Sequence, residues 1–560
     1  MSFDIKKHKN DLIFIPLGGA GEIGMNVNLY HYQGQWLMVD LGAGFTDDYY
    51  PGINLMVAEL NYIRKQRDKL LGIVLTHAHE DHLGAVQYLW KELGCPIYTT
   101  KFTANFLRSK LKETSFAKEI KIIEIDPKST TQIGPFSIET VPLSHSTPEM
   151  QSLMIRTDLG NVFHTGDWKF DHNPLIGDPN DQKFLSKLGK EGVLAMIADS
   201  TNVFNDTFSG SEGDLRKSLV ELVAGCEKMV VVTTFASNVA RIETILKAAE
   251  EAGRRVVMAG RSLWRILEAA QASGYLLDIQ PVMRPDQMGN IKREKLLIIS
   301  TGCQGEPMAA TTKMANNAHP QLRLSPGDTI IFSSKIIPGN EKKIFKLLNK
   351  LIAQQVEVFT EKEHFVHVSG HPSKGELKLM YELIRPKIAV PVHGELMHIH
   401  EHINLAKSWG VPETVQVLNG DVIRLAPGPA KVIDKVESGY LGIDGNFLLP
   451  GNSSILKMRR RLQESGVVFI VLILNDRNQM IMPPVIKAPG VLDIEEDAMI
   501  ITKMAKEVHK ALELLMESVA QKKQRSDVVE NTVRTALRKV LKQEVGKNPA
   551  IEVELIYGFK

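Results

Sequence analysis

The hydrophobic residues of the first two hundred positions form short, uninterrupted runs that are typical of buried β-strands. Such apolar runs lie at residues 12–15, 36–39 and 73–75, and strands that are covered on both faces carry this pattern. Residues 83–90 instead space their apolar side chains as a helix does. Strands with intervening helices over about residues 12–205 therefore predict a layered α/β sandwich with its functional site along one edge.

From about residue 208 the pattern changes to a regular alternation of helix and strand. Strand-like runs separated by helix-length segments imply parallel strands joined by crossover helices. The sequence therefore predicts a second α/β domain. Its helix-like segments are 215–224, 241–252, 263–272 and 341–353, and its strand-like segments are 229–234, 256–258, 296–300 and 330–333.

A third region begins near residue 459, after a passage that contains Gly, Ser and Asn. It carries two strand-like runs followed by two helical patterns, each with its apolar residues on one face. These features predict a small α+β domain, in which we see no catalytic motif. The strand-like runs are 467–474 and 480–486, and the helical patterns are 501–519 and 529–540.

The most informative segment follows the apolar run at 73–75 and places four potential metal ligands within six residues: His77, His79, Asp81 and His82. Alternate residues of an extended segment point to the same side, so His77 and His79 can converge on one cation. A turn after them would direct Asp81 and His82 to a second. Imidazole and carboxylate ligands suit zinc, manganese or iron(II), and paired ions can clamp a phosphoryl displacement. A polar surface loop is the alternative, but the density of donors favours a metal site.

That cluster lacks enough ligands by itself, and further candidates appear at the ends of later apolar runs. His145 follows the run at 141–143, Asp167 follows the run at 162–163, and His393 follows the run at 388–392. Each residue alone is a weak signal, because a lone histidine after a strand is more often a core or surface residue. Together with the dense cluster, the three complete two coordination shells.

The order of these motifs resembles that of the metallo-β-lactamase superfamily. Asp40 matches the first motif, an acid that orients the metal-binding loop, and Asp199, His371 and His393 resemble motifs of the nucleic-acid-processing β-CASP branch. The longer phrases at 18–24, 166–171 and 301–307 are similar to the bacterial ribonuclease J family. The resemblance covers the chain from about residue 12 to its C-terminus.

This resemblance implies two divalent metal ions per subunit, zinc or manganese. His77, His79 and His145 would hold one ion, and Asp81, His82 and His393 the other, with Asp167 bridging them. The implied catalytic residues are Asp81, Asp167, Asp199 and His371.

The resemblance also implies a substrate-binding segment, formed by His367, Val368, Ser369, Gly370 and His371. His371 would lie by the scissile phosphate as a donor to the leaving oxygen or a stabiliser of its charge, and the segment would cradle a nucleotide phosphate with backbone N–H groups and the Ser369 hydroxyl. The residues after His371 depart from the more acidic or amide-bearing stretch that is usual in the family. This departure bears on phosphate binding and leaves the metal ligands intact.

A further phosphate-binding candidate lies in the second domain, where the strand-like run at 229–234 opens into a helix at Ser237 and Asn238. Exposed N–H groups and hydroxyls at a helix start suit phosphate. An ordinary helix N-cap explains the same residues equally well.

The position of His393 indicates the domain organisation, because it lies beyond the second α/β domain yet must return to the first metal site. The second domain is therefore predicted to be an insertion. We expect a metallo-β-lactamase αββα sandwich in two parts, 1–208 and 363–437, interrupted by a β-CASP domain at 209–362. A linker at 438–460 and a C-terminal α+β domain at 461–560 complete the chain.

The glycines Gly19, Gly21 and Gly24 have the spacing of a dinucleotide-binding loop, and Asp40 lies about 20 residues further on. That site needs a helix to begin at the third glycine. Residues 25–30 alternate apolar and polar side chains, as a strand does. The glycines therefore indicate a tight turn between strands.

Composition limits the remaining choices. The 67 basic and 65 acidic residues leave a net charge of +2, so nucleic-acid binding must come from local patches. The basic stretches 522–525 and 534–542 are more often solvated helix faces than RNA contacts.

Three cysteines without CxxC spacing fit a reducing compartment. The polar N-terminus lacks the apolar segment of a secretory signal, and the longest apolar run, 467–474, is too short to cross a bilayer. We expect a cytoplasmic protein that does not contact membranes.

The sequence as a whole predicts a metal-dependent ribonuclease that hydrolyses single-stranded RNA with a water activated by two metals. The resemblance implies 5′-to-3′ exonuclease activity on 5′-monophosphorylated RNA and endonuclease activity, in RNA maturation and decay. A homodimer or homotetramer and partners from an RNA-decay complex are also expected. Two alternatives stay open: a thioester hydrolase or lactonase of the same superfamily, and a non-catalytic RNA-binding scaffold.

Overall fold

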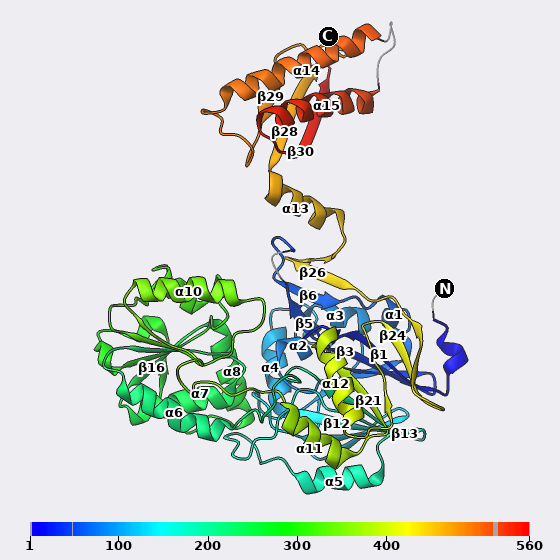
Figure 1. The fold of residues 1–560 in the computed structure, drawn as a ribbon, viewed down its shortest axis with the longest axis vertical. Coiled ribbons are helices and arrows are strands. Elements are labelled where there is room, and N and C mark those ends of the chain that lie inside the picture. Colours follow the sequence, from blue (N-terminus) through cyan, green and yellow to red (C-terminus); the bar gives the residue numbers. More distant parts are fainter. Residues whose placement is uncertain (1–2, 47–48, 519–524, 559–560) are drawn as a thin grey trace. The chain divides into compact units, whose positions relative to one another are not determined.

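The computed structural model describes residues 3–46, 49–518 and 525–558. The chain divides into two compact units (Figure 1). The first contains residues 1–45 and 56–440, and the second contains residues 46–55 and 441–560. Within the described part of the chain, no helix combines the length and the apolar character that crossing a membrane requires.

The first unit contains two large sheets whose strands are mostly buried on both faces. The first sheet has eight strands, and its central strand β1 is buried along its whole length. The order is β25 (Lys431–Lys435), β24 (Asp421–Ala426), β1 (Leu12–Gly18), β3 (Val27–Tyr32), β4 (Gln35–Val39), β7 (Leu70–Val74), β8 (Ile97–Thr99) and β9 (Ile122–Glu124).

The second sheet has seven strands and changes from antiparallel to parallel pairing at its centre. The order is β10 (Thr130–Ile133), β11 (Phe136–Pro142), β12 (Gln151–Thr157), β13 (Gly160–His164), β14 (Ala195–Asp199), β21 (Ile388–Val392) and β23 (Glu413–Thr414). Because β13, β14 and β21 are parallel, the loops that leave their carboxyl ends emerge at one edge of the sheet.

The two sheets face each other across one hydrophobic core, which includes Phe14 and Tyr30 of the first sheet and Ile155 and Ile197 of the second. A second core lies between the seven-stranded sheet and the helices α5 and α11. This layering confirms the predicted α/β sandwich. Its helices are α1 (Asn61–Arg64), α2 (Glu80–Leu83), α3 (Val86–Leu93), α4 (Lys101–Leu111), α5 (Gln182–Glu191), α11 (Lys374–Ile384) and α12 (Leu396–Ser408).

The predicted second α/β domain is a six-stranded parallel sheet covered by helices. Figure 1 shows α10 on one side of this sheet and α6 and α7 on the other. The strand order is β17 (Val282–Met283), β16 (Arg255–Ala259), β18 (Leu296–Ser300), β15 (Val230–Thr233), β19 (Thr329–Phe332) and β20 (Glu357–Phe359). The helices are α6 (Glu212–Gly225), α7 (Val239–Glu251), α8 (Arg261–Ser273), α9 (Ala310–Ala315) and α10 (Glu341–Ala353).

All eight helices and strands predicted for this domain are present, whereas β17, β20 and α9 were not predicted. These three elements are two to six residues long, which is too short to show a hydrophobic period. The chain leaves the sandwich after β14 and has returned to it by α11 and β21. The strands β14 and β21 are hydrogen-bonded neighbours. The inserted topology is therefore confirmed, while the domain boundaries at residues 208, 362, 437 and 460 stay a prediction.

The glycine-rich loop is a turn between strands, as the sequence predicts. Gly19, Gly21 and Gly24 all have positive φ angles, of 83°, 89° and 92°, a backbone region that glycine enters freely. The short strand β2 (Ala20–Gly21) lies within the loop and pairs with β22 (Gly394–Glu395). The strand β3 begins at Val27, so no helix follows the third glycine and the loop cannot cradle a pyrophosphate.

The second unit contains a three-stranded sheet and two long helices. The sheet order is β29 (Val485–Lys487), β28 (Val467–Leu474) and β30 (Ala550–Tyr557), and the helices α14 (Ala498–Ser518) and α15 (Ser526–Glu544) pack on it around a core of their own. The strand predicted at 480–486 is wrong for residues 481–484, because Pro483 and Pro484 cannot donate to a strand ladder, while Met480 forms an isolated bridge with Leu474. Val519 of the predicted helix face and residues 522–524 of the predicted basic stretch lie outside the described residues.

The remaining elements are short. They are β5 (Ala43–Phe45), β6 (Leu55–Ala58), the hairpin of β26 (Tyr440–Asp444) and β27 (Phe447–Pro450), the helix α13 (Ser454–Ser465), and 3-10 turns at Ile5–His8, Arg67–Lys69, Pro285–Gln287 and Arg293–Lys295.

Candidate metal centre

The dense histidine cluster lies at the junction of β7 and α2. Residues 76–79 continue from the strand, and α2 begins at Glu80 with His79 as its N-cap in an extended conformation. His77 is completely buried, and His82 is 2% exposed. The change from extended backbone to helix separates His77 and His79 from Asp81 and His82, as the sequence predicts.

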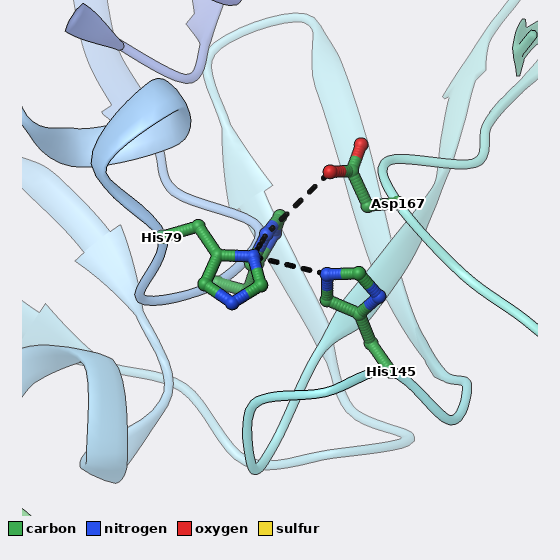
Figure 2. A group of neighbouring side chains, drawn as sticks. His79, His145 and Asp167 are labelled. Carbon is green, nitrogen blue, oxygen red and sulfur yellow. Dashed lines mark hydrogen bonds and ion pairs between the residues drawn. The ribbon is translucent and has the colours of Figure 1, made fainter. Parts of the chain in front are cut away.

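A first group of donors gathers His77, His79, His145 and Asp167, with one ligand atom of each within 4.8 Å of every other. His79 Nδ1 lies 3.0 Å from both His77 Nε2 and His145 Nε2. Asp167 Oδ2 lies 3.9 Å from His77 Nε2. Figure 2 shows the side chains of His79, His145 and Asp167 pointing toward one another from separate loops.

A second group gathers Asp81, His82, Asp167 and His393 within the same limit. His82 Nε2 lies 3.0 Å from Asp167 Oδ2, and His393 Nε2 lies 3.2 Å from Asp81 Oδ2 and 3.5 Å from Asp167 Oδ1. The carboxylate of Asp167 therefore belongs to both groups. The structure brings together all seven residues that the sequence indicates as ligands.

The histidine nitrogens that face away from these groups are held by hydrogen bonds. His145 Nδ1 lies 2.6 Å from the Gly370 carbonyl oxygen and must donate to it. His82 Nδ1 lies 2.7 Å from an oxygen of the Asp40 carboxylate. With Nδ1 donating in each case, Nε2 keeps its lone pair for a metal. Partners of this kind fix the tautomer and orientation of metal-binding histidines.

Two threonine hydroxyls hold the outward-facing nitrogens of His77 and His393 in the same way. His77 Nδ1 lies 2.9 Å from Thr76 Oγ1, whose proton goes to Asp40. His393 Nδ1 lies 2.8 Å from Thr201 Oγ1, which donates to Asp199 Oδ1. The sequence reasoning missed Thr76 and Thr201 as supporting residues, although Thr76 directly precedes His77 and Thr201 lies two residues after Asp199.

The donor sets fit divalent cations. Three imidazole nitrogens and a carboxylate converge in the first group, and two of each converge in the second, combinations that suit zinc or manganese. Asp167 Oδ1 is buried and has no hydrogen-bond partner among the described residues. The histidine nitrogens of the first group face one another at 3.0 Å, and there are too few protons for each contact to be a hydrogen bond. A cation between these nitrogens would relieve the repulsion of their lone pairs.

The charge state of the histidines differs between the two groups. Burial, followed by neighbouring histidines, lowers the pKa of His77 and His145 well below the usual value, and burial lowers the pKa of His79 to about 4. Burial also disfavours the charged forms of His82 and His393. Nearby carboxylates outweigh burial there, and they raise the pKa of His82 well above its usual value and that of His393 to about 9. In the metal-free protein, the histidines of the first group are therefore neutral, and His82 and His393 of the second group are protonated.

The segment at 367–371 lies beside the two groups. His371 Nδ1 lies 2.8 Å from Asp199 Oδ2 and 3.9 Å from Asp167 Oδ2. Burial opposes the charged imidazolium, but these two carboxylates raise the pKa of His371 above its usual value. Ser369 Oγ accepts from the His371 backbone N–H at 3.1 Å and from the Asn202 amide at 2.6 Å. Asn202, which also donates to the His371 carbonyl oxygen, is a third supporting residue that the sequence reasoning missed.

His367 lies at the other end of this segment in a positively charged environment. Its Nδ1 is buried without a hydrogen-bond partner among the described residues. Burial and the nearby charges of Arg241, Lys335 and Lys169 lower the pKa of His367 well below its usual value. Arg241 and Lys169 are paired with Glu212 and Asp171, so the charge of Lys335 and the unpartnered Nδ1 of His367 are what this site offers to an anion.

A fully buried arginine connects the start of the segment at 367–371 to the inserted second α/β domain. Arg241 donates to both oxygens of Glu212, to the carbonyl and hydroxyl of Ser333, and to the carbonyl of Val366. Ser333 Oγ also donates to the Val366 carbonyl at 2.7 Å. No periodicity in the sequence signals this contact, because the partners of Arg241 come from three separate segments.

The second phosphate-binding candidate has a structural explanation. Asn238 is the N-cap of α7, where its Oδ1 accepts from the Arg241 N–H and its Nδ2 donates to Glu212. Both amide atoms therefore have protein partners. Ser237 directly precedes this cap and is partly exposed.

Four family models match this chain. They are the metallo-β-lactamase superfamily (residues 21–233), the β-CASP domain of ribonuclease J (227–351), a Zn-dependent metallo-hydrolase RNA specificity domain (355–413) and the ribonuclease J C-terminal domain (454–556). Together they bear out the predicted architecture of an αββα sandwich with a β-CASP insertion and a small C-terminal domain.

Curated relatives match over nearly the whole chain. Ribonuclease J of Sinorhizobium meliloti is 39% identical over 97% of each chain. Ribonuclease J 1 of Streptococcus pyogenes is 33% identical over 98% of each, and ribonuclease J of Thermus thermophilus is 33% identical over 97% of this chain and 95% of its own. A solved protein of unknown function from Enterococcus faecalis has a TM-score of 0.50 at 16% identity, over 74% of this chain and 99% of its own, and shows the fold alone.

Proposed function

Because this chain belongs to the ribonuclease J family and is therefore a metal-dependent ribonuclease, we propose that it removes nucleotides from the 5′ end of 5′-monophosphorylated, single-stranded RNA and also cleaves internally. The observation that carries the proposal is the shared carboxylate of Asp167, which joins two ligand groups beside the segment at 367–371. The end preference, the internal cleavage and the number of metals are the proposed parts.

His77, His79 and His145 would hold one divalent cation, and Asp81, His82 and His393 a second, with Asp167 between them. The proposed ions are zinc or manganese, because both accept mixed imidazole and carboxylate ligands. Such a pair supplies positive charge to the phosphoryl oxygens and lowers the pKa of water toward about 7. Asp40, Thr76 and Thr201 would keep the ligand imidazoles in the tautomers that bind metal.

His371 is the proposed proton donor to the leaving 3′ oxygen. Asp199 holds its Nδ1, which leaves Nε2 to donate. The carboxylates that raise its pKa keep this imidazole protonated nearer to neutral pH, as a general acid requires. Hydrolysis with this donor leaves a 3′-hydroxyl on one product and a 5′-phosphate on the other.

The segment at 367–371 is the proposed pocket for a 5′-monophosphate. The Ser369 hydroxyl and the positive charge of Lys335 near His367 would offer the donor and the charge that a phosphate needs. A terminal phosphate held there would place the first phosphodiester at the metals and, after each cleavage, admit the next nucleotide.

Product analysis on internally labelled RNA tests this proposal. RNA with a 5′-monophosphate and the same RNA with a 5′-triphosphate are incubated with manganese or zinc and the wild-type protein, beside its His77→Ala variant. We expect progressive release of mononucleotides, faster from the monophosphate and absent in the variant. Equal rates from the 5′-monophosphate and 5′-triphosphate RNAs would contradict the proposed phosphate pocket. Release of long internal fragments alone would contradict the proposed exonuclease activity. Metal content by mass spectrometry distinguishes two ions from one.

We also propose that the protein is cytoplasmic, forms a homodimer or homotetramer, and joins RNA-decay partners. An apolar sheet face supports association: Phe469, Val485 and Ile556 of the three-stranded sheet are 43%, 52% and 40% exposed. Light scattering after size-exclusion chromatography tests the oligomer. Affinity capture from cell extract, beside a variant with Phe469→Glu, tests partners that use this face.

A further inference from the structure

The outer side of α10 carries a row of lysines. Ile344, Leu347 and Leu351 are buried against the sheet, while Lys342, Lys346 and Lys350 recur every fourth residue. We name these three the α10 lysine row. Residues four apart lie on the same helix face, about 6 Å from one another along the axis. The row therefore presents evenly spaced positive charges along the helix.

These charges are not neutralised by carboxylates. Among the described residues, neither Lys342 nor Lys346 has a carboxylate within salt-bridge distance, and Lys350 donates to the neutral amide oxygen of Asn316. Some lysines on other helices are paired with carboxylates, as are Lys503 with Glu544 and Lys539 with Glu507. The net charge of the whole protein is only +2, so this row is a local source of positive potential.

A shallow groove with an aromatic side chain runs along the same face. Phe345 is 46% exposed, and Lys362 Nζ lies 5.8 Å from its ring centroid. Lysines beside an exposed aromatic ring are what single-stranded nucleic acid binds, because the cations contact phosphates and the ring stacks on a base. The groove is lined by Lys342, Phe345, Lys346, Asn349, Lys350 and Ala353.

The fold connects this row to the proposed phosphate pocket. The strand β19 ends at Phe332, and the next residue, Ser333, contacts the Val366 carbonyl at the start of the pocket segment. The chain then runs through residues 333–340 into α10, so Lys342 lies at the end of the row nearer to that edge of the sheet.

The motif at 301–307, which the proposed catalysis does not use, fixes this connection. Gln304 Nε2 donates to the Lys335 carbonyl at 2.8 Å, and Gln304 Oε1 accepts from the Ile337 N–H at 3.0 Å. One side chain thus holds two points of the segment 333–340 that leads into α10. The position of the row relative to the pocket segment is therefore set by the folded lobe.

We propose that the α10 lysine row and Phe345 form a second binding site for single-stranded RNA, outside the metal centre. It rests on the assignment of this chain as a ribonuclease and deepens the proposed function by adding a site for the part of the RNA that does not reach the metals. The affinity for RNA then increases with length, because a long strand occupies both sites.

Fluorescence anisotropy with labelled RNA tests this site without cleavage. The background is the full chain with His77→Ala, and the RNAs are about 5 and about 30 nucleotides long, spanning the lengths that single-strand sites cover. Replacing Lys342, Lys346 and Lys350 together by alanine removes the row. The matched control replaces Lys183, Lys187 and Lys190 on α5, which are exposed and remove the same charge.

The row variant is expected to bind the long RNA about tenfold or more weakly at low salt, and its dependence on salt should decrease by about one unit of slope per lysine. Binding of the short RNA and of the control variant should be unchanged. An unchanged affinity of the row variant for the long RNA, or an equal loss in the control, overturns the proposal.

A second pair of variants distinguishes RNA from an acidic protein segment. Phe345→Ala should weaken binding of the long RNA, and Phe345→Tyr should retain it, because tyrosine also stacks on bases. A polyglutamate peptide that binds as tightly as the RNA, with no effect of Phe345→Ala, overturns the assignment to RNA. The proposed end preference is tested by product analysis, so the two proposals can fail separately.

Discussion

Thr201 orients His393, one of the proposed metal ligands, through a hydrogen bond, since its hydroxyl accepts from His393 Nδ1 and donates to Asp199. We expect Thr201→Val to weaken metal binding at the second group by about 10–100-fold, the usual effect of losing such a partner. The first group should keep its metal.

Metal titration against a competing chelator measures both affinities. Thr207→Val, at an exposed threonine outside the site, is the control. Equal affinity of both groups in Thr201→Val and wild type would show that the hydrogen bond does not position His393.

The opposite pKa shifts of the two histidine groups predict how protons leave when metal binds. His393, with a pKa of about 9, and His82, whose pKa nearby carboxylates raise well above its usual value, are protonated at pH 8 in the metal-free protein. A metal must displace these protons, whereas His77, His79 and His145 are already neutral. Filling the second group should therefore release protons, and filling the first should not.

A pH-indicator titration of the metal-free protein in weak buffer measures this release. Because protons compete for the same nitrogens, the affinity of the second group should fall steadily as the pH decreases below about 9. His393→Gln should release one proton fewer. Proton release that is spread evenly over both equivalents of metal would contradict the assignment.

At the scale of elements, the buried pair of Arg241 and Glu212 joins α7 and α6 to the strand β19 and the pocket segment. Arg241→Met would leave the Glu212 carboxylate buried without its partner. We expect the free energy of unfolding of the inserted α/β domain to fall by roughly 3–5 kcal/mol, as for other buried ion pairs that lose one partner. Denaturant unfolding followed by a probe in the inserted lobe measures the change.

A surface pair of the same type provides the comparison. Arg265→Met removes an exposed contact to Glu113, and such pairs contribute about 0–1 kcal/mol. Adding Glu212→Leu to Arg241→Met should recover part of the lost stability, because no unpaired charge then stays buried. Equal effects of the two arginine substitutions would show that Glu212 is solvated.

The secondary-structure elements of the inserted lobe show how far a hydrophobic pattern predicts structure. The eight predicted helices and strands are present because each contains several turns or a continuous apolar run. The pattern was wrong at residues 481–484, where apolar residues flank two prolines. It did not reveal β17 or β20, because two or three residues carry no measurable period.

At the scale of the whole molecule, the C-terminal unit has its own hydrophobic core, formed by β28, β30, α14 and α15. Each metal-ligand group found among the described residues lies in the other unit. We therefore expect a fragment of residues 454–560 to fold alone and to bind no catalytic metal.

Circular dichroism during heating, together with metal analysis, tests that fragment. A cooperative transition without bound zinc or manganese is the expected result. A non-cooperative melt, or one that appears only in the full chain, would show that this core needs the rest of the protein.

The sequence alone indicated which residues are candidates for the chemistry. The spacing of His77, His79, Asp81 and His82 indicates two metals because chain neighbours in a strand and a helix point in fixed directions. The apolar runs before His145, Asp167 and His393 indicate strand ends, where functional side chains gather. Their roles as ligands stay a prediction that the convergence of the seven side chains supports.

Only the tertiary structure decided which atoms meet. Gly370 accepts from His145 across 225 positions of the chain, and Arg241 reaches Val366 across 125. The lysines of α10 acquire their relation to the pocket through the turn that Gln304 holds. Such contacts depend on how separate elements pack, and side-chain periodicity within one element carries no information about its distant partners. The sequence therefore specifies the chemistry of the site, and the fold specifies its geometry.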